Sequence, residues 1–196
     1  SRRIPIEPLA ADGDHIRKGQ PVMRLDGPAR ALRTAERVAR NFVQRLSGVA
    51  TLTSRYVAAS AGTRARILDT RKTTPGWRRF EKYAVVCGGG LNHRQRLDDL
   101  VLIKDNHLAA LAAERPNPIA AAVMRARRRY PRLKVEVEAD TLAQVKEAVD
   151  AGADIILLDN MSPQQMRRAV SRVAGRALTE ASGGITLTSV RAVAAT

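Results

Sequence analysis

Several residue types are scarce in this sequence, and each scarcity narrows the class of protein. Aromatic residues make up 3% of the 196 residues, which leaves few side chains on which nucleic-acid bases could stack. Cys87 is the one cysteine, so no internal disulfide can form, and this favours a cytoplasmic protein. No stretch approaches the ~20 apolar residues of a membrane-spanning helix. The first residues, SRRIP, lack the apolar core of a secretory signal, so we expect none.

Positive charge, by contrast, is abundant. The formal net charge is +15, from 34 basic and 19 acidic residues. Such an excess attracts anions, which include nucleic acids, membrane surfaces and phosphorylated or carboxylated metabolites. The densest basic run, residues 125–134, is typical of the solvated end of a helix, and no nucleic-acid-binding motif accompanies it. We therefore expect most of these charges to be solvated surface, with neither a nucleic acid nor a membrane as partner.

From residue 64 onward, short apolar stretches alternate with amphipathic ones. This alternation predicts parallel strands joined by helices, an α/β fold. Predicted strands span residues 64–68, 100–103, 133–137, 154–158 and 176–179. Predicted helices span residues 79–86, 117–129, 141–151, 162–173 and 187–195. Asp140 or Thr141 is expected to cap one of these helices, and Ser162 to cap another that has Pro163 at its first position.

The first 61 residues have a different pattern. Turn signals at residues 12–14 and 18–21 separate short strands, one of which is predicted at residues 22–25. A helix is predicted from Pro28 to about Ser47 and ends at Gly48. A second helix is predicted at residues 50–61. Hydrophobic residues make up 44% of the chain, so a sizeable core can form.

Polar residues follow each of the five predicted strands. The carboxyl ends of parallel strands lie at one edge of a sheet, where barrels of βα units carry their active sites, so we expect these residues to converge. Several cations and glycines among them indicate a pocket for an anion with more than one charge. The five clusters are residues 69–72, 104–107, Glu138, residues 159–160 and residues 182–184.

Three motifs within residues 69–107 carry a family resemblance. They read DTRKT-PG, GGG-NHR and IKDNH, in that order. The chain, from about Gly13 to Thr196, resembles the quinolinate phosphoribosyltransferase family, the carboxylating nicotinate-nucleotide pyrophosphorylases of NAD synthesis. The resemblance implies an incomplete (β/α) barrel of parallel strands at residues 29–196, preceded at residues 1–28 by the end of an α/β amino-terminal domain. It also implies that the barrel is truncated at its carboxyl end.

The resemblance implies a phosphoribosyl-transferring enzyme. The family transfers the phosphoribosyl group of phosphoribosyl pyrophosphate to the ring nitrogen of quinolinate, and loss of carbon dioxide then gives nicotinate mononucleotide. The two adjacent carboxylates of quinolinate call for fixed cations, and an arginine matches a carboxylate through two parallel hydrogen bonds. The positions implied to bind the two substrates are Thr70, Arg71, Lys72, His93, Arg94, Lys104, Asn160, Ser182, Gly183 and Gly184.

Lys104, Glu138 and Asp159 are the implied catalytic residues. Mg²⁺ prefers oxygen ligands, so Glu138 and Asp159 are expected to hold it together with the pyrophosphate group. The same carboxylates would stabilise an oxocarbenium-like transition state. The family motif Glu-Arg-x-Ala-x-Asn stands here at residues 36–41. It implies that Arg37 reaches the substrate of a neighbouring subunit, and hence a homodimer or a dimer-based oligomer.

Other functions stay open from the sequence. A relative in the same fold that is associated with molybdenum transport is one alternative, although Arg71, Arg94 and Lys104 favour a dicarboxylate substrate. An inactive fragment is another, since the family needs more strands than are found here. A basic nucleic-acid-binding protein is the least favoured, because aromatic residues are so few.

Overall fold

The computed structural model describes residues 4–196, which fall into two compact units. We call the first the helical unit; it extends to Ala61 and includes Arg66–His93. We call the second the sheet unit; it comprises Gly62–Ala65 and Arg94–Thr196. The first three residues of the predicted amino-terminal remnant lie outside the described part. Within residues 4–196, no helix has the length and apolar character needed to cross a membrane.

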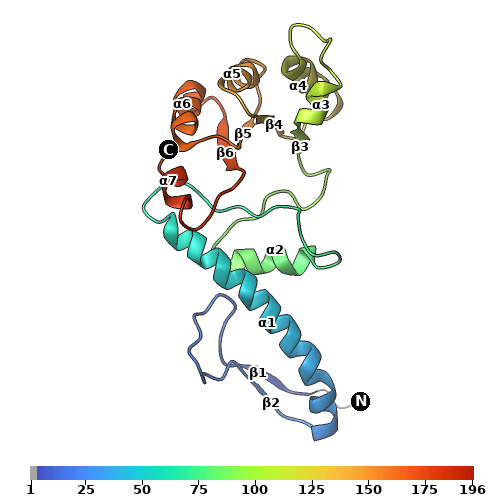
Figure 1. The fold of residues 1–196 in the computed structure, drawn as a ribbon. Coiled ribbons are helices and arrows are strands. Elements are labelled where there is room, and N and C mark those ends of the chain that lie inside the picture. The colour runs from blue at the N-terminus through green and yellow to red at the C-terminus, as the bar shows by residue number, and fades with distance from the viewer. Residues whose placement is uncertain (1–3) are drawn as a thin grey trace. The chain divides into compact units, whose positions relative to one another are not determined.

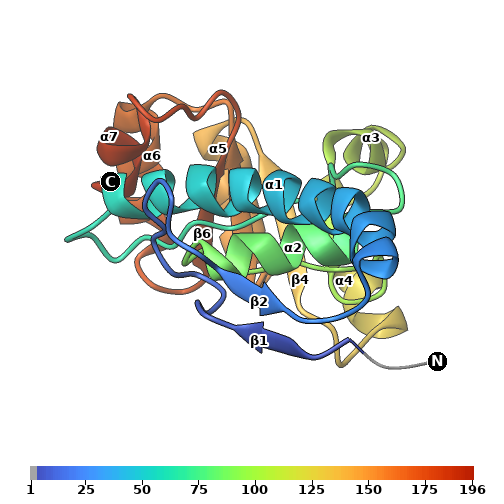
Figure 2. The ribbon, with the colours of Figure 1, turned by 90° about the horizontal axis from the view of Figure 1, so that it is seen from below.

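The helical unit contains a small antiparallel sheet and two helices (Figure 1). Strand β1 (Ile6–Pro8) pairs with β2 (Met23–Leu25), which confirms the strand predicted at residues 22–25. Helix α1 spans Ala29–Ala59 and helix α2 spans Arg78–Cys87. Figure 2 shows α1 and α2 side by side.

Helix α1 is continuous, so the predicted end at Gly48 and the predicted second helix at residues 50–61 are wrong. An ideal Cβ built on Gly48 meets no atom within 4 Å, so the missing side chain serves no packing role there. A glycine inside a helix costs only about 1 kcal/mol relative to alanine. Burial of the apolar face of α1 against α2 stabilises the helix by more than this penalty. A prediction from local signals alone gives the glycine too much weight.

Close packing between α1 and α2 explains two of the three consecutive glycines that follow α2. A Cβ on Gly88 would overlap the carbonyl oxygen of Ala50, and one on Gly90 would lie 2.9 Å from Thr53 Cγ2. The absence of side chains at these two glycines therefore lets helix α1 pack closely here. Nearby, Phe42 stacks on Trp77 with ring centroids 4.6 Å apart, which joins α1 to the segment before α2.

The sheet unit is built on four parallel strands in the order β3-β4-β5-β6. Its strands are β3 (Val101–Ile103), β4 (Val135–Ala139), β5 (Ile155–Asp159) and β6 (Leu178–Ser182). Its helices are α3 (Asp105–Ala109), α4 (Pro118–Arg129), α5 (Leu142–Asp150), α6 (Pro163–Val173) and α7 (Val190–Ala194). This arrangement confirms the predicted α/β fold class with parallel strands joined by helices.

The strand predicted at residues 64–68 does not form. Only Leu68 makes a bridge, and its partner is Leu91 rather than a strand of the four-stranded sheet. The stretch has two consecutive large apolar residues, Ile67 and Leu68, while Arg64 and Arg66 are exposed. Two apolar residues are enough for a single β-bridge but too few for a buried strand of the sheet. The prediction that the cluster at residues 69–72 follows a strand of this sheet is therefore wrong.

The two faces of the sheet differ in chemistry because neighbouring residues of a strand point to opposite faces. One face places Val137, Ile156 and Leu158 in the core, covered by α4, α5 and α6 (Figure 1). The other face carries Glu136 and Glu138 from β4. Locally, Ser162 is confirmed as a cap, and of the two alternatives Asp140 and Thr141 the cap is Thr141, since Ser162 and Thr141 accept hydrogen bonds from the backbone N–H groups of Gln165 and Gln144.

Candidate active site

The carboxyl edge of the sheet collects most of the predicted site residues of the sheet unit. The register places Ile103 opposite Val137, Ala139 opposite Leu158 and Asp159 opposite Ser182. Strands β4, β5 and β6 extend further than predicted, so Glu138, Asp159 and Ser182 are the last or next-to-last residues of their strands rather than the residues after them. Pairing with the neighbouring strands continues the ladder one to three residues beyond the predicted ends.

Three carboxylates gather at this edge. Glu138, Asp140 and Asp159 each offer an oxygen, and these oxygens lie within 4.8 Å of one another. Carboxylate oxygens in such a group are the donors that Mg²⁺ takes, so the described residues fit the metal that the family resemblance implies. Our sequence reasoning included Asp140 only as a helix cap. The signal that identifies it is its spacing of two from Glu138 at the end of β4, because alternate residues of an extended chain point to the same side.

Lys104 lies at the end of β3 beside this acidic group. Its Nζ is 3.6 Å from Glu138 Oε2, and its side chain is 46% exposed, against 12% for Glu138. Burial raises the pKa of Glu138, Lys104 opposes the rise, and the nearby Asp159 and Asp105 reinforce it. His107 fixes the main chain here, since its Nδ1 accepts the backbone N–H of Lys104 at 2.9 Å.

A tight backbone arrangement follows β5 and β6. The N–H of Asn160 donates to the carbonyl oxygen of Ser182 at 3.1 Å, and its side-chain nitrogen donates to Asp159 Oδ2 at 2.8 Å. Asn160 and Gly183 both have positive φ, 52° and 88°. A Cβ on Gly183 would overlap the side-chain oxygen of Asn160 and lie 2.9 Å from its Cγ. Only glycine therefore fits here, and Gly184 beyond it borders open space.

Residues 70–72, which we call the cationic loop, belong to the helical unit. Thr70 Oγ1 accepts the N–H of Lys72 at 3.0 Å, and the carbonyl oxygen of Arg71 accepts the N–H of Thr73 at 3.0 Å. The Nε atom of Arg71 is buried and has no hydrogen-bond partner among the described residues. A buried donor on a charged side chain costs free energy unless it is paired. An anion bound at Arg71 would supply that partner.

An ion pair between the two helices holds this loop. Arg45 of α1 donates to Glu81 of α2 at 2.7 Å and to Thr74 Oγ1 at 2.6 Å. Glu81 also accepts the backbone N–H of Thr74 at 3.1 Å. The side-chain hydrogen bond from Arg45 holds the pKa of Glu81 below its ordinary value. The loop that carries Arg71 is thus anchored to both helices.

The remaining predicted residues are placed as follows. The main chain of His93 is bonded to two buried side chains: Asp69, which belongs to the predicted cluster at residues 69–72, and Lys82, to which the sequence analysis gave no role. Arg94 belongs to the sheet unit, where its guanidinium donates to the carbonyl oxygen of Leu100 at 3.5 Å. Arg37 is exposed on α1. The helical unit holds Arg37, Thr70, Arg71, Lys72 and His93; the sheet unit holds Arg94, Lys104, Glu138, Asp159, Asn160, Ser182, Gly183 and Gly184.

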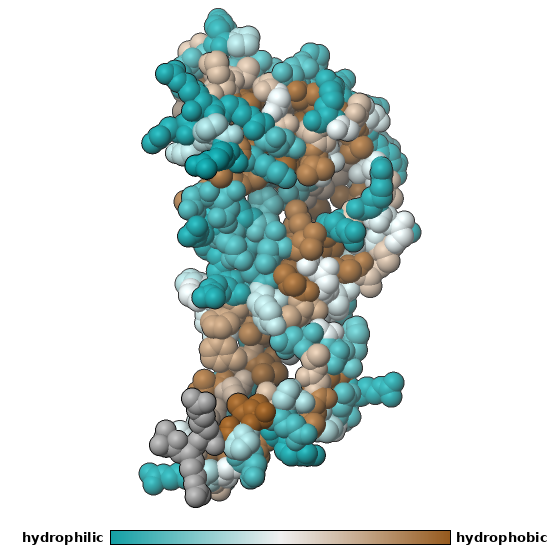
Figure 3. Space-filling view, turned by 180° about the vertical axis from the view of Figure 1, so that it is seen from behind, coloured by the Kyte–Doolittle hydropathy of each residue, from teal (hydrophilic) through white to brown (hydrophobic). Residues whose placement is uncertain are grey.

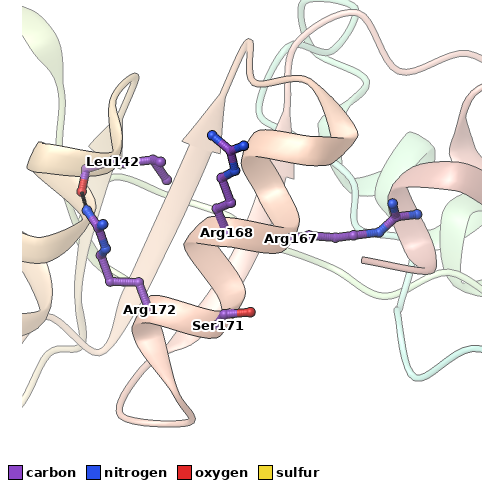
Figure 4. Close-up of a pocket in the computed structure, with 5 residues that line it drawn as sticks. All are labelled: Leu142, Arg167, Arg168, Ser171 and Arg172. Atoms are coloured by element: carbon purple, nitrogen blue, oxygen red, sulfur yellow. Dashed lines mark hydrogen bonds between the residues drawn. The ribbon is translucent and has the colours of Figure 1, made fainter.

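A separate basic hollow lies on the surface of α6, lined by Leu142, Arg167, Arg168, Ser171 and Arg172. Arg172 donates to the carbonyl oxygen of Leu142 at 2.9 Å, whereas Arg167 and Arg168 point in other directions (Figure 4). Guanidinium groups that diverge do not form a fork around one anion. We therefore assign no anion-binding site to this hollow.

Comparison with known proteins gives a consistent result. Residues 49–196 match the family model of the quinolinate phosphoribosyl transferase C-terminal domain, and residues 2–47 match that of the N-terminal domain. The chain is 47% identical to the probable carboxylating nicotinate-nucleotide pyrophosphorylase of Bacillus subtilis, over 92% of this chain. It is 45% identical to the carboxylating nicotinate-nucleotide pyrophosphorylase of Mycobacterium leprae, over 90% of this chain. The chain spans 61% of the length of each of these two relatives.

The solved structures agree with the fold. The nicotinate-nucleotide pyrophosphorylase of Francisella tularensis superposes with a TM-score of 0.92 and is 41% identical. The similarity covers 98% of this chain and 67% of that structure. The two proteins are therefore similar both in sequence and in fold.

Proposed function

The chain belongs to the quinolinate phosphoribosyltransferase family, and from this premise we propose that it takes part in the family's reaction. In that reaction the phosphoribosyl group of phosphoribosyl pyrophosphate is transferred to quinolinate with decarboxylation. The products are nicotinate mononucleotide, carbon dioxide and pyrophosphate. The observation that carries the proposal is the acidic group of Glu138, Asp140 and Asp159 beside the cation of Lys104 at one edge of the sheet.

We assign recognition of the dicarboxylate to the cationic residues. Arg71 has a buried Nε without a partner among the residues described, which supports a bound carboxylate at that atom. Arg94, His93 and Lys104 supply further donors, with Thr70 at the start of the cationic loop. Loss of carbon dioxide leaves an electron pair on the ring carbon next to the nitrogen. Cations fixed in advance, and the positive ring nitrogen made by the transfer, would stabilise that charge until the carbon takes a proton.

We assign the phosphoribosyl substrate to the acidic group and to the backbone beyond β5 and β6. Glu138, Asp140 and Asp159 would hold Mg²⁺, which neutralises the pyrophosphate leaving group when bound. The bond between the ribose C1 and the pyrophosphate oxygen breaks, the bond between C1 and the ring nitrogen forms, and the carboxylates stabilise the positive charge that develops on the sugar.

The backbone at the ends of β5 and β6 supports an anion site for the phosphate. Ser182, Gly183 and Gly184 would receive it with Lys72 and Asn160. Gly183 and Gly184 have positive φ, a conformation in which successive N–H groups can line a concave anion site. A Cβ at Gly183 would overlap the side-chain oxygen of Asn160, so a side chain there would disturb this backbone arrangement.

We further propose a homodimer in the cytoplasm. Helices α1 and α2 expose several large apolar side chains: Val38, Val43, Leu52, Phe80 and Val86. Apolar side chains are interspersed with hydrophilic ones on the face that Figure 3 shows. Burial of such residues against a second copy would release their apolar surface from water. The same dimer would bring Arg37 to the partner's substrate, as the family motif implies.

The direct test is product formation from quinolinate, phosphoribosyl pyrophosphate and Mg²⁺. We expect nicotinate mononucleotide with the unaltered chain and a loss of product with Lys104→Ala. Lys146→Ala is the matched control, because Lys146 is an exposed lysine on α5 that pairs only with Asp150 among the residues described. Absence of quinolinate binding by calorimetry would reject the dicarboxylate substrate and favour the relative associated with molybdenum transport. Binding without turnover would instead indicate that residues beyond this chain are needed.

A further inference from the structure

Lys82 and Asp69 form a buried ion pair to which the proposed mechanism assigns no role. Their side chains are 1% and 6% exposed. Lys82 lies in the middle of α2, and Asp69 directly precedes the cationic loop at residues 70–72. A buried ion pair is costly to desolvate and is weak evidence for stability by itself. The role of the Lys82–Asp69 pair therefore has to be inferred from the groups that the two side chains contact.

The pair holds the main chain of His93 on both sides. Lys82 Nζ donates to the Asp69 carboxylate and, at 3.0 Å, to the carbonyl oxygen of His93. The same carboxylate oxygen of Asp69 accepts the backbone N–H of His93 at 2.9 Å. His93 has no regular secondary structure, so these contacts fix its backbone where no helix or sheet ladder does.

Further hydrogen bonds join this network to the segment that precedes the cationic loop. Leu91 donates its N–H to Ile67 at 2.8 Å and accepts the N–H of Asp69 at 3.1 Å. The side-chain oxygen of Asn92 faces only acceptors; with the amide turned so that its nitrogen takes that place, Asn92 donates to the carbonyl oxygen of Lys82 at 2.9 Å and to Asp69 Oδ2 at 2.5 Å. The segment before the loop and the segment before His93 are thus locked to each other and to α2.

We propose that Lys82 and Asp69 are positioning residues for recognition of the dicarboxylate. They touch no substrate themselves. They set the main chain from which His93 projects, and Asp69 sets the start of the loop that carries Arg71 two residues later. This inference rests on the proposed function for the identity of the ligand, while the hold on His93 can be measured without any ligand.

The test requires a variant that keeps the fold. Lys82→Met alone would leave a buried, unpaired carboxylate, which is strongly destabilising. The double variant Lys82→Met/Asp69→Asn removes both charges and keeps an oxygen that can accept the N–H of His93. Lys146→Met/Asp150→Asn removes a comparable lysine–aspartate pair from the exposed side of α5, where the two side chains are 66% and 50% exposed.

A ligand-independent readout comes from the imidazole resonances. The chain has three histidines, so the ring protons of His93 can be assigned by comparison with His93→Gln. We expect the His93 resonance to shift in the Lys82/Asp69 double variant and to stay in place in the Lys146/Asp150 control. An unmoved His93 resonance in a folded double variant overturns the proposal.

Steady-state kinetics give the second readout. We expect the double variant to raise the KM for quinolinate about tenfold, with a smaller effect on the KM for phosphoribosyl pyrophosphate. Equal KM values for quinolinate in the Lys82/Asp69 double variant and the Lys146/Asp150 control overturn the proposal. If the double variant does not fold, Asn92→Ala removes only the outer hydrogen bonds of the network and should raise the quinolinate KM about threefold; an unchanged KM overturns the proposal. If the unaltered chain does not bind quinolinate, the proposed function fails, and the His93 resonance alone decides the positioning role.

Discussion

Lys104 and Glu138 form an ion pair across the ends of two neighbouring strands, with Nζ 3.6 Å from Oε2. The lysine is half-exposed, whereas the carboxylate is nearly buried. The burial raises the pKa of Glu138 more strongly than Lys104 lowers it. One carboxylate at the sheet edge is therefore held in an environment that favours its protonated form, beside two further acids with which it would share a cation.

The raised pKa of Glu138 predicts a pH-dependent effect of Glu138→Gln on stability. A carboxyl group with a raised pKa in the folded state contributes most stability below its unfolded pKa, and that contribution is lost as the pH rises through the folded pKa. Glu138→Gln should therefore raise the melting temperature at neutral pH in the absence of metal, and the gain should shrink in acid. Thermal melts across pH measure this, and a variant less stable at neutral pH contradicts it.

Asp140 is predicted to be a metal ligand. Asp140→Asn should weaken Mg²⁺ binding about tenfold or more, since even residues that only support a ligand cost 10–100-fold. Calorimetric titration of Mg²⁺ with inorganic pyrophosphate present measures the affinity. Asp150→Asn serves as control, because Asp150 is exposed and pairs with Lys146 on α5. Equal affinities for the two variants would remove Asp140 from the metal site.

Local signals predicted the parts of the fold that depend on near neighbours. Ser162 was identified as one cap and Asp140 or Thr141 as another, because the bond that such a cap makes lies within three residues of chain. The four strands of the sheet were located because short stretches with apolar residues alternate along the chain with amphipathic ones. Their ends were misplaced by about two residues, since Ala139 and Ser182 still lie in the ladder, which depends on the partner strand.

Contacts between distant segments could not be predicted in this way. A lysine in a helix is normally solvated, and nothing in the residues around Lys82 shows that Asp69, thirteen positions earlier, lies within reach of its amine. The continuity of α1 through Gly48 depends in the same way on its packing against α2. The sequence motifs therefore identified residues proposed to touch substrates, and Asp69 with them, but gave Lys82 no role.

Gly183→Ala tests the backbone arrangement after β6. The new Cβ would overlap Asn160, and φ is positive at this position, so a loss of about 1–3 kcal/mol of stability is expected. Displacement of Asn160 should also weaken binding of phosphoribosyl pyrophosphate. Gly152→Ala is the matched control, because Gly152 also has positive φ (77°) but its Cβ would meet nothing within 4 Å. A similar effect of both variants on substrate affinity would contradict a specific role for Gly183.

Glu81→Gln tests the link between the two helices and the cationic loop. The hydrogen bond from Arg45 lowers the pKa of Glu81 in the folded state. Its contribution to stability is therefore present above the unfolded pKa and is lost as the pH falls through the folded value. The variant should lose about 1 kcal/mol at neutral pH, a typical net value for one hydrogen bond. Chemical denaturation at several pH values should show the difference disappear in acid; a constant difference contradicts it.

Mixing two inactive variants tests whether Arg37 contributes to the site of the partner subunit. If it serves the partner's substrate, Arg37→Ala and Lys104→Ala are each inactive alone, because every site in either homodimer lacks one cation. Mixing them in equal amounts makes half the dimers hybrid, and each hybrid has one complete site. About a quarter of the original activity should then return. If Arg37 serves its own chain's site, no hybrid contains a complete site and mixing restores nothing. Arg40→Ala, three residues along the exposed side of α1, should retain activity without mixing.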